Sequence, residues 1–187
     1  MTTLAVLLAA GAGTRFVGDT HKLRAQIRGA AVLTHSLRAV VAADIGDIVV
    51  ITGADTFDDL LKDCTTVHNE QWASGQRSSV LSAINEAERR GCDVVVIGAA
   101  DQPFVSPDDW RAVAVHHSPI AVATYNGERA TPVRLHKSTW ELFRTLESDP
   151  DAGARSLMNL HPELVSQVAC KGSGADIDTT EDLQKWT

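Results

Sequence analysis

The sequence predicts an α/β fold: a mostly parallel sheet with helices on both faces, in a three-layer Rossmann-like arrangement. Short apolar runs typical of buried strands alternate with segments of helical periodicity along the chain. Strands that alternate with helices form parallel sheets, because each helix carries the chain back to the start of the next strand. The chain has 187 residues, 44% of them hydrophobic and 22% charged, so it is long enough to bury a core and has a globular composition.

Five apolar runs predict strands, and four segments between them have helix-compatible periodicity. One helix also has a start signal, because Ser106 stands in the N-cap position, Pro107 comes next, and acidic residues follow. The expected elements are the strands Leu4–Leu8, Ile48–Thr52, Thr65–His68, Val94–Gly98 and Ile120–Thr124, and the helices Ala31–Ala43, Asp55–Leu61, Ser78–Arg89 and Pro107–His116.

The rhythm changes after residue 125, where Asn126-Gly127 is a turn signal. A final helix follows Asp178, whose carboxylate is expected to cap it. No linker, low-complexity run or internal repeat is found, so one domain over residues 1–187 is expected. The elements expected here are the strands Pro132–His136 and Leu164–Ala169 and the helices Ser138–Leu146, Ala152–Leu160 and Thr179–Trp186.

The charge balance and the cysteines exclude several classes of protein. There are 17 Lys and Arg against 24 Asp and Glu, which gives a net charge of −7, and general nucleic-acid binding relies on basic surface. Apolar runs are too short to span a membrane. The three scattered cysteines predict neither a disulfide framework nor a zinc site. Because the apolar start lacks the basic region of a signal peptide, a cytoplasmic protein is expected.

The chain begins with an apolar run that ends in small residues and two glycines, Gly11 and Gly13, followed by Arg15 and Lys22. Glycine backbone turns sharply and exposes its N–H groups, and amides together with cations bind polyphosphates. A Walker loop is excluded because no Gly-Lys-Ser/Thr tail is present, and the third glycine of a dinucleotide fingerprint is missing. The segment therefore predicts another kind of nucleotide-binding loop, while His21 is either a surface residue or a secondary phosphate contact.

The extended loop pattern, Leu-Ala-Ala-Gly-x-Gly-x-Arg-Phe followed by Gly18 and Lys22-Leu23, resembles the signature loop of the MobA-like nucleotidyltransferases. Within that group it looks most like the molybdenum cofactor cytidylyltransferases. Three more segments resemble family motifs in the family's order, and together they span nearly the whole chain. They are residues 69–80 (Asn-x-x-Trp-x-x-Gly-x-x-x-Ser), 101–105 (Asp-Gln-Pro) and 176–183 (Asp-Ile-Asp-Thr-x-Glu-Asp-Leu). The resemblance implies a fold like that of the nucleotide-diphospho-sugar transferases.

The resemblance also implies the site residues. Asp101 follows an expected strand and would hold Mg²⁺, a hard cation that favours carboxylate and phosphate oxygens. Asp178 is either a second ligand or only the cap of the last helix. Ser78 either caps its helix or contacts the nucleoside, and both roles are compatible. The implied catalytic residues are Arg15, Lys22 and Asp101, the metal ligands Asp101 and Asp178, and the nucleotide-binding residues Leu8, Ala9, Ala10, Gly11, Gly13, Arg15, Lys22, Gly75, Ser78 and Ser79.

The activity implied by the resemblance is transfer of CMP from CTP to molybdopterin, which forms molybdopterin cytosine dinucleotide and pyrophosphate. Leu-Ala-Ala-Gly is typical of CTP-using members, and the Cβ of Ala10 narrows the pocket against purines. The chain departs from the family where Ala130-Thr131 replaces Gly-His and where the loop before Lys22 is longer. The alternatives are guanylyl or cytidylyl transfer to another small phosphorylated acceptor, and a non-catalytic nucleotide-binding maturation partner of a molybdoenzyme. The resemblance also implies a molybdoenzyme or its chaperone as a protein partner.

Overall fold

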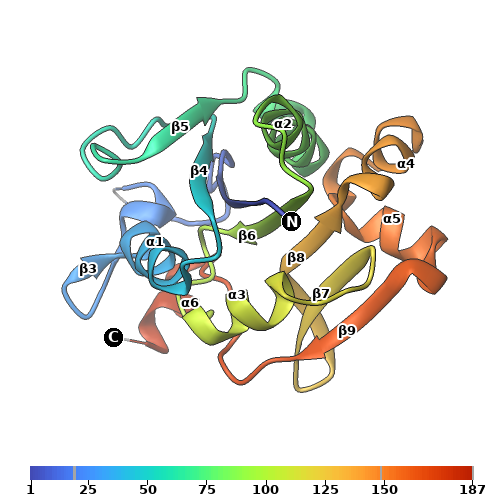
Figure 1. Ribbon diagram of the computed structural model, residues 1–187. Helices are drawn as coiled ribbons and strands as arrows, with labels where there is room; N and C mark the ends of the chain where they lie inside the picture. Colours follow the sequence, from blue (N-terminus) through green and yellow to red (C-terminus); the bar gives the residue numbers. More distant parts are fainter. Residues whose placement is uncertain (19, 148, 187) are drawn as a thin grey trace.

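A computed structural model of the chain describes residues 1–18, 20–147 and 149–186. Its centre is a seven-stranded sheet in the order β5-β4-β1-β6-β8-β7-β9, in which β8 runs antiparallel to both neighbours and the other pairings are parallel (Figure 1). The predicted mostly parallel α/β sheet is confirmed. The strands are β1 (Thr3–Ala9), β4 (Asp47–Thr52), β5 (Thr65–His68), β6 (Val94–Ala99), β7 (Ile120–Tyr125), β8 (Glu128–His136) and β9 (Val165–Ala169), and β2 (Gln26–Ile27) and β3 (Ala30–Ala31) form a separate ribbon.

Helices cover both faces of the sheet and bury a separate apolar cluster on each (Figure 1). In β1, Ala5 and Leu7 face one cluster while Leu4 and Val6 face the other, which is why the strand reads as an unbroken apolar run. One face carries α1 (Val32–Ala43) and α3 (Pro107–Ala114), and the other carries α2 (Gln76–Arg89), α4 (Trp140–Thr145) and α5 (Arg155–Leu160).

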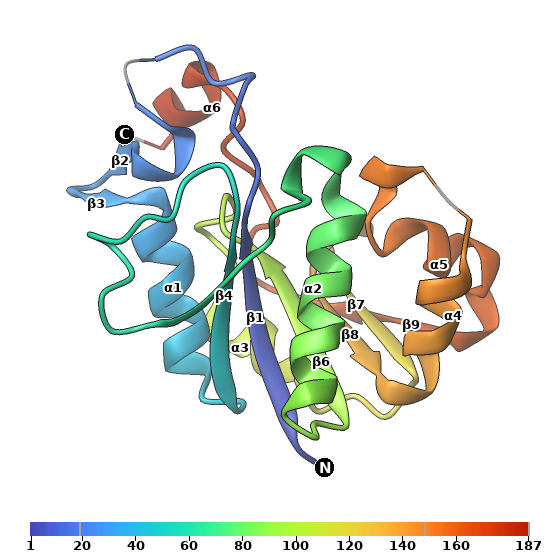
Figure 2. The same ribbon diagram turned by 90° about the horizontal axis from the view of Figure 1, so that it is seen from above.

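The remaining helical segments are short. The last helix, α6 (Thr180–Gln184), lies beside the loop that leaves β1, at the edge of the sheet where β1 ends (Figure 2). Within the described ranges, no helix is long and apolar enough to cross a membrane. The 3-10 turns are η1 (Lys22–Arg24), η2 (Trp72–Ser74), η3 (Lys137–Thr139), η4 (Pro150–Ala152) and η5 (Pro162–Leu164).

Strand β8 is longer than the sequence predicts, because it begins directly after the turn that joins it to β7. Asn126 and Gly127 have φ of 52° and 86°, the left-handed pair that a two-residue hairpin turn requires. Val122 pairs with Val133 but Ala123 pairs with Ala130, so Thr131-Pro132 forms a bulge. A proline is tolerated inside this strand because the bulge takes it out of the regular hydrogen-bond ladder.

The prediction of a helix at Asp55–Leu61 is wrong, since this segment forms turns. The Asp55 carboxylate accepts a hydrogen bond from the Phe57 N–H at 2.9 Å and an ion pair from Arg24 at 3.0 Å. Phe57 has φ 53° and is fully buried. A left-handed residue interrupts a helix, and burial of the Phe57 ring outweighs the local helical preference.

The helix caps agree with the sequence at one helix and differ at two. Ser106 caps α3 through a capping box with Asp109, as predicted. Gly75 is the N-cap of α2, so Ser78 lies inside the helix and the interpretation of Ser78 as its cap is wrong. Thr179, not Asp178, caps α6 by accepting a hydrogen bond from Asp182 N–H, because the Asp178 carboxylate is engaged by cations elsewhere.

Gly98 of β6 packs against α3 so closely that a side chain has no room. A Cβ at this position would overlap the outer ring of the Trp110 indole, which is 2% exposed. Gly98→Ala should therefore lower the free energy of unfolding by about 1–3 kcal/mol, measured by urea denaturation. The double variant with Trp110→Phe removes the outer ring and should lose less stability than the two single changes summed. A Gly98→Ala protein as stable as the wild type would contradict this packing.

Candidate active site

A cleft of about 1320 Å³ opens at the edge of the sheet where the parallel strands end. Ligands of open α/β sheets bind at this edge. Its walls come from the glycine loop after β1, the start of α2, the end of β6, the β7–β8 hairpin, α5 and the segment before α6. Of the predicted site residues, the cleft is lined by Leu8, Ala9, Ala10, Gly11, Gly13, Arg15, Lys22, Gly75, Ser79, Asp101 and Asp178; Ser78 lies outside its lining.

The glycine loop turns sharply at Gly13, which has φ 64°. A Cβ at Gly13 would lie 3.1 Å from Cγ of Lys22 and 3.3 Å from Nε2 of His21. Glycine is thus required both for the left-handed backbone and for the close passage of the Lys22 side chain. The loop is closed by a hydrogen bond from the Phe16 N–H to the Gly13 carbonyl at 2.9 Å.

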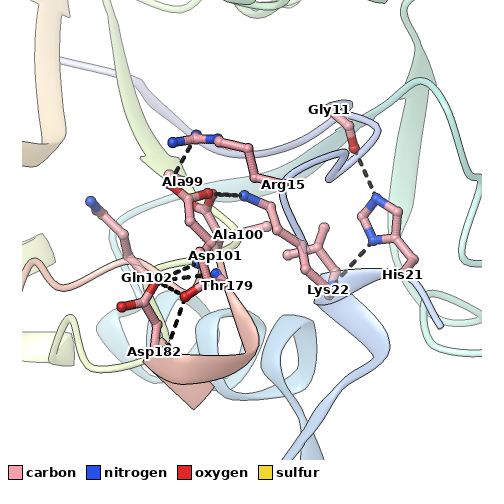
Figure 3. A network of polar contacts seen from close by, with 12 residues as sticks. Gly11, Arg15, His21, Lys22, Ala99, Ala100, Asp101, Gln102, Thr179 and Asp182 are labelled. Carbon is pink, nitrogen blue, oxygen red and sulfur yellow. Dashed lines mark hydrogen bonds and ion pairs between the residues drawn. The ribbon is translucent and has the colours of Figure 1, made fainter. Parts of the chain in front are cut away.

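His21 holds the loop in place, a role beyond the two that the sequence predicts, which are a surface residue and a secondary phosphate contact. Its Nδ1 accepts a hydrogen bond from the Leu23 N–H at 3.1 Å, so the proton is on Nε2, which donates to the Gly11 carbonyl at 2.9 Å. Figure 3 shows the ring directed toward Gly11. His21 therefore orients the carbonyl side of the loop, and its position next to Lys22 is the sequence signal that marks it.

Lys22 lies between two carboxylates. Its Nζ is 2.6 Å from Oδ2 of Asp101 and 2.7 Å from Oδ1 of Asp178, and Nη2 of Arg15 is 2.8 Å from Oδ2 of Asp178. In Figure 3, Lys22 and Arg15 both reach toward the segment that carries Asp101, just after the end of β6. Burial lowers the pKa of Lys22, but Asp101 and Asp178 outweigh it and raise that pKa above its usual value. Lys22 is therefore cationic at neutral pH.

The C-terminal segment brings Asp178 to the site. The Ile177 N–H donates to the Asp101 carbonyl at 2.9 Å, and the Ile177 side chain is fully buried. Farther along, the rings of Phe104 and Trp186 pack with their centroids 3.8 Å apart. These contacts place Asp178 against Lys22 although the two residues are far apart in the sequence.

Gln102 joins three segments around the cleft. Its Nε2 donates to the Gly174 carbonyl at 3.0 Å, and its Oε1 accepts a hydrogen bond from the Thr131 hydroxyl. The same hydroxyl accepts from the Ala99 N–H at 3.1 Å. The Thr131 hydroxyl therefore holds β8 against the end of β6.

The start of α2 forms another wall of the cleft. Asn69 donates from Nδ2 to the hydroxyls of Ser78 and Ser79 at 2.8 and 3.0 Å, and the Ser78 hydroxyl lies 2.9 Å from the Gln71 and Gly75 carbonyls. Ser78 is therefore used to fasten the preceding turn to the helix. Ser79 is mostly buried but still reaches the cleft lining.

The two carboxylates suit a hard divalent cation. Within the described parts of the chain no group of three or more His, Cys, Asp and Glu side chains gathers as a metal site. The oxygens of Asp101 and Asp178 nevertheless converge on one cation, the Lys22 ammonium. Mg²⁺ is commonly held by one or two carboxylates, with phosphate and water completing its shell, so this donor set fits. Nearby, desolvation and then the charges of Asp178 and Asp101 raise the pKa of Asp176.

Comparisons with known proteins agree with this architecture. The chain is 28% identical over 194 residues to the purine catabolism protein PucB of Bacillus subtilis, covering 96% of this chain and 93% of that protein. It is 30% identical over 141 residues to the bifunctional protein GlmU of Allorhizobium ampelinum, covering 70% of this chain but spanning only 30% of that longer protein.

Solved structures share the fold at lower identity. A nucleotidyl transferase from Methanothermobacter thermautotroptrophicus (Mth528) superposes with a TM-score of 0.82 at 22% identity, covering 98% of this chain and 95% of that chain. Rv0371c of Mycobacterium tuberculosis, in its complex with manganese, gives a TM-score of 0.77 at 21% identity, covering 100% and 98%. Residues 5–167 match the family model of the MobA-like NTP transferase domain. The chain therefore belongs to the MobA-like NTP transferase family.

Proposed function

We propose that this protein is a single-domain, Mg²⁺-dependent nucleotidyltransferase that transfers CMP from CTP to the phosphate of molybdopterin, forming molybdopterin cytosine dinucleotide and pyrophosphate. The observation that carries the proposal is the meeting of Lys22 and Arg15 with Asp101 and Asp178 beside a glycine loop. Cations and loop amides suit a triphosphate, while paired carboxylates suit the divalent cation that accompanies it. Both halves of a metal–nucleotide site are thus within contact distance of each other.

The proposed reaction needs charge stabilisation more than a protein base. A phosphate oxygen of the acceptor attacks the α-phosphorus of CTP in line, the new P–O bond forms, and pyrophosphate leaves. That oxygen is already ionised near neutral pH, so the enzyme has to align the two phosphates and offset the developing charge. Arg15, Lys22 and the amides of Gly11 and Gly13 do this from the loop. Mg²⁺, when held by Asp101 and Asp178, supplies further neutralisation of the phosphate oxygens.

The preference for a pyrimidine rests on the wall around Ala10. Its carbonyl accepts a hydrogen bond from the Ala54 N–H at 3.0 Å, which anchors this part of the loop backbone. Trp72 and the Ala10 carbonyl both lie close to Gly53, because Gly53 has no side chain: a Cβ there would lie 2.6 Å from both the Ala10 carbonyl oxygen and Cβ of Trp72. Because this wall is anchored, it cannot move to make room for a purine. A steric clash with the purine would select for the pyrimidine as effectively as favourable contacts would.

The acceptor has a second candidate. Thr131 replaces the family histidine, and its hydroxyl is bound to Gln102 and the Ala99 amide. This favours, as the alternative, transfer to another small phosphorylated acceptor. Incubation of the protein with each α-labelled NTP, with molybdopterin present or absent, separates the candidates. A labelled dinucleotide formed only with CTP and molybdopterin supports the proposal, whereas nucleotide binding without turnover would support a non-catalytic partner.

Asp101→Asn tests the metal assignment. It keeps the shape of the side chain but removes a charge, so we expect turnover to fall by about 100-fold or more. The matched control is Asp59→Asn, which removes an exposed carboxylate paired with Arg24 outside the cleft lining. Initial rates and circular dichroism of both variants give the answer. Near-wild-type turnover in a folded Asp101→Asn protein would refute the assignment.

Ala10→Gly tests the base preference. Removing the Cβ enlarges the pocket, so the efficiency with GTP relative to CTP should rise by about 10-fold, in line with about 1–3 kcal/mol for one methylene-sized contact. Ala12→Gly changes backbone freedom in the same loop and serves as the control. The ratio of kcat/KM for the two nucleotides is measured in each protein. A wild type that prefers GTP would overturn the CTP proposal while leaving nucleotidyl transfer intact.

A further inference from the structure

The position between the two candidate metal-binding carboxylates already holds a cation belonging to the protein. Three of the four oxygens of Asp101 and Asp178 accept from Lys22 or Arg15, at 2.6 to 2.8 Å. The side chain of Lys22 is 12% exposed, so this ammonium is held inside the site. Two positive side chains and two negative ones meet there, and their formal charges cancel.

We propose that Lys22 blocks the metal site, a role called here the guard: its ammonium keeps a free divalent cation from the carboxylates until a bound polyphosphate draws the ammonium away. The site then takes the divalent cation and the nucleotide together, and metal alone binds weakly. This inference rests on the proposed function, because it assumes that the loop binds a polyphosphate.

Electrostatics gives the reason for the exclusion. A divalent cation entering beside Lys22 meets a positive charge that occupies the same oxygens, and like charges repel most strongly where water is excluded. With Lys22 in place, the carboxylate pair offers an incoming metal little net negative charge. Asp178 is the more strongly occupied of the two, because Lys22 takes Oδ1 and Arg15 takes Oδ2.

The position of Lys22 lets its ammonium move from the carboxylates to a bound phosphate. Its stem passes beside Gly13 of the loop while its ammonium contacts the carboxylates, so it stands between the expected phosphate site and the expected metal site. Its four-carbon stem is flexible, and a lysine ammonium also binds phosphate oxygens. A polyphosphate on the loop supplies oxygens for Lys22 and Arg15, and the exchange frees the carboxylates. Binding of the two ligands is then coupled, and the coupling is reciprocal.

The test is Mn²⁺ binding without nucleotide, measured by the electron paramagnetic resonance signal of free Mn²⁺. Lys22→Met and Lys22→Gln should each bind Mn²⁺ about 10-fold more tightly than the wild type, because the competing charge is gone. Lys22→Arg keeps the charge and should bind weakly. Adding Asp178→Asn to Lys22→Met removes a ligand and should abolish the gain. Circular dichroism confirms that each variant is folded.

Two control variants separate the guard from a general charge effect. Arg24→Met removes a cation from the same short 3-10 turn, and its partners Asp55 and Asp59 lie outside the cleft lining, so Mn²⁺ affinity should not change. Arg15→Met removes the other cation on Asp178 but leaves Lys22, so it should tighten Mn²⁺ binding much less. Equal tightening in either control, or unchanged affinity in folded Lys22→Met and Lys22→Gln, would overturn the inference.

These measurements do not depend on turnover. If the Lys22 variants bind Mn²⁺ more tightly while the wild type transfers no nucleotide, the inference about Lys22 is supported and the proposed function is refuted. If the wild type transfers CMP while the Lys22 variants bind Mn²⁺ no more tightly than the wild type, only the inference about Lys22 is refuted.

Discussion

The ion pairs of Lys22 with Asp101 and Asp178 are the contact on which the arrangement of the cleft depends. They join three parts of the chain: the loop after β1, the end of β6 and the segment before α6. Each charge is costly to bury alone, and breaking such a pair by removing one partner leaves an uncompensated charge. The loop and the C-terminal segment therefore hold each other in position, and any ligand that takes one charge must compensate for the other.

The C-terminal segment is consequently part of the site. The family match ends at residue 167, whereas Asp178 lies beyond it. Burial of Ile177, its hydrogen bond to Asp101, and the packing of Trp186 on Phe104 bind the segment to the body of the fold. The apolar anchors provide stability, and the polar residue between them faces the cleft. The C-terminal segment thus adds a charged residue to the site although it does not form a strand of the sheet.

Strand β8 gives the cleft its other wall. Because it runs antiparallel between β6 and β7, its start and not its end lies at the ligand edge. The hairpin turn therefore projects over the cleft, and the bulge at Thr131 turns that residue toward Gln102. The Thr131 hydroxyl also accepts from the Ala99 N–H, so this residue links β8 to β6.

Local signals in the sequence determined most of the secondary structure. The apolar runs gave the parallel strands, Ser106 gave a helix start, and Asn126-Gly127 gave the hairpin turn, since each depends on residues that are neighbours in the chain. The glycine loop and the strand-end position of Asp101 likewise placed these residues at one edge of the sheet, and the cleft includes both.

The tertiary structure decided what depends on distant partners. The helix expected at Asp55–Leu61 is absent because Arg24 and the buried ring of Phe57 select turns there. Asp178 does not cap α6, because Lys22 and Arg15 hold its carboxylate, and Ser78 fastens a turn through Asn69. Local sequence determines which backbone shapes are favourable, but the burial and charge pairing that choose among them are set by residues that only folding brings together.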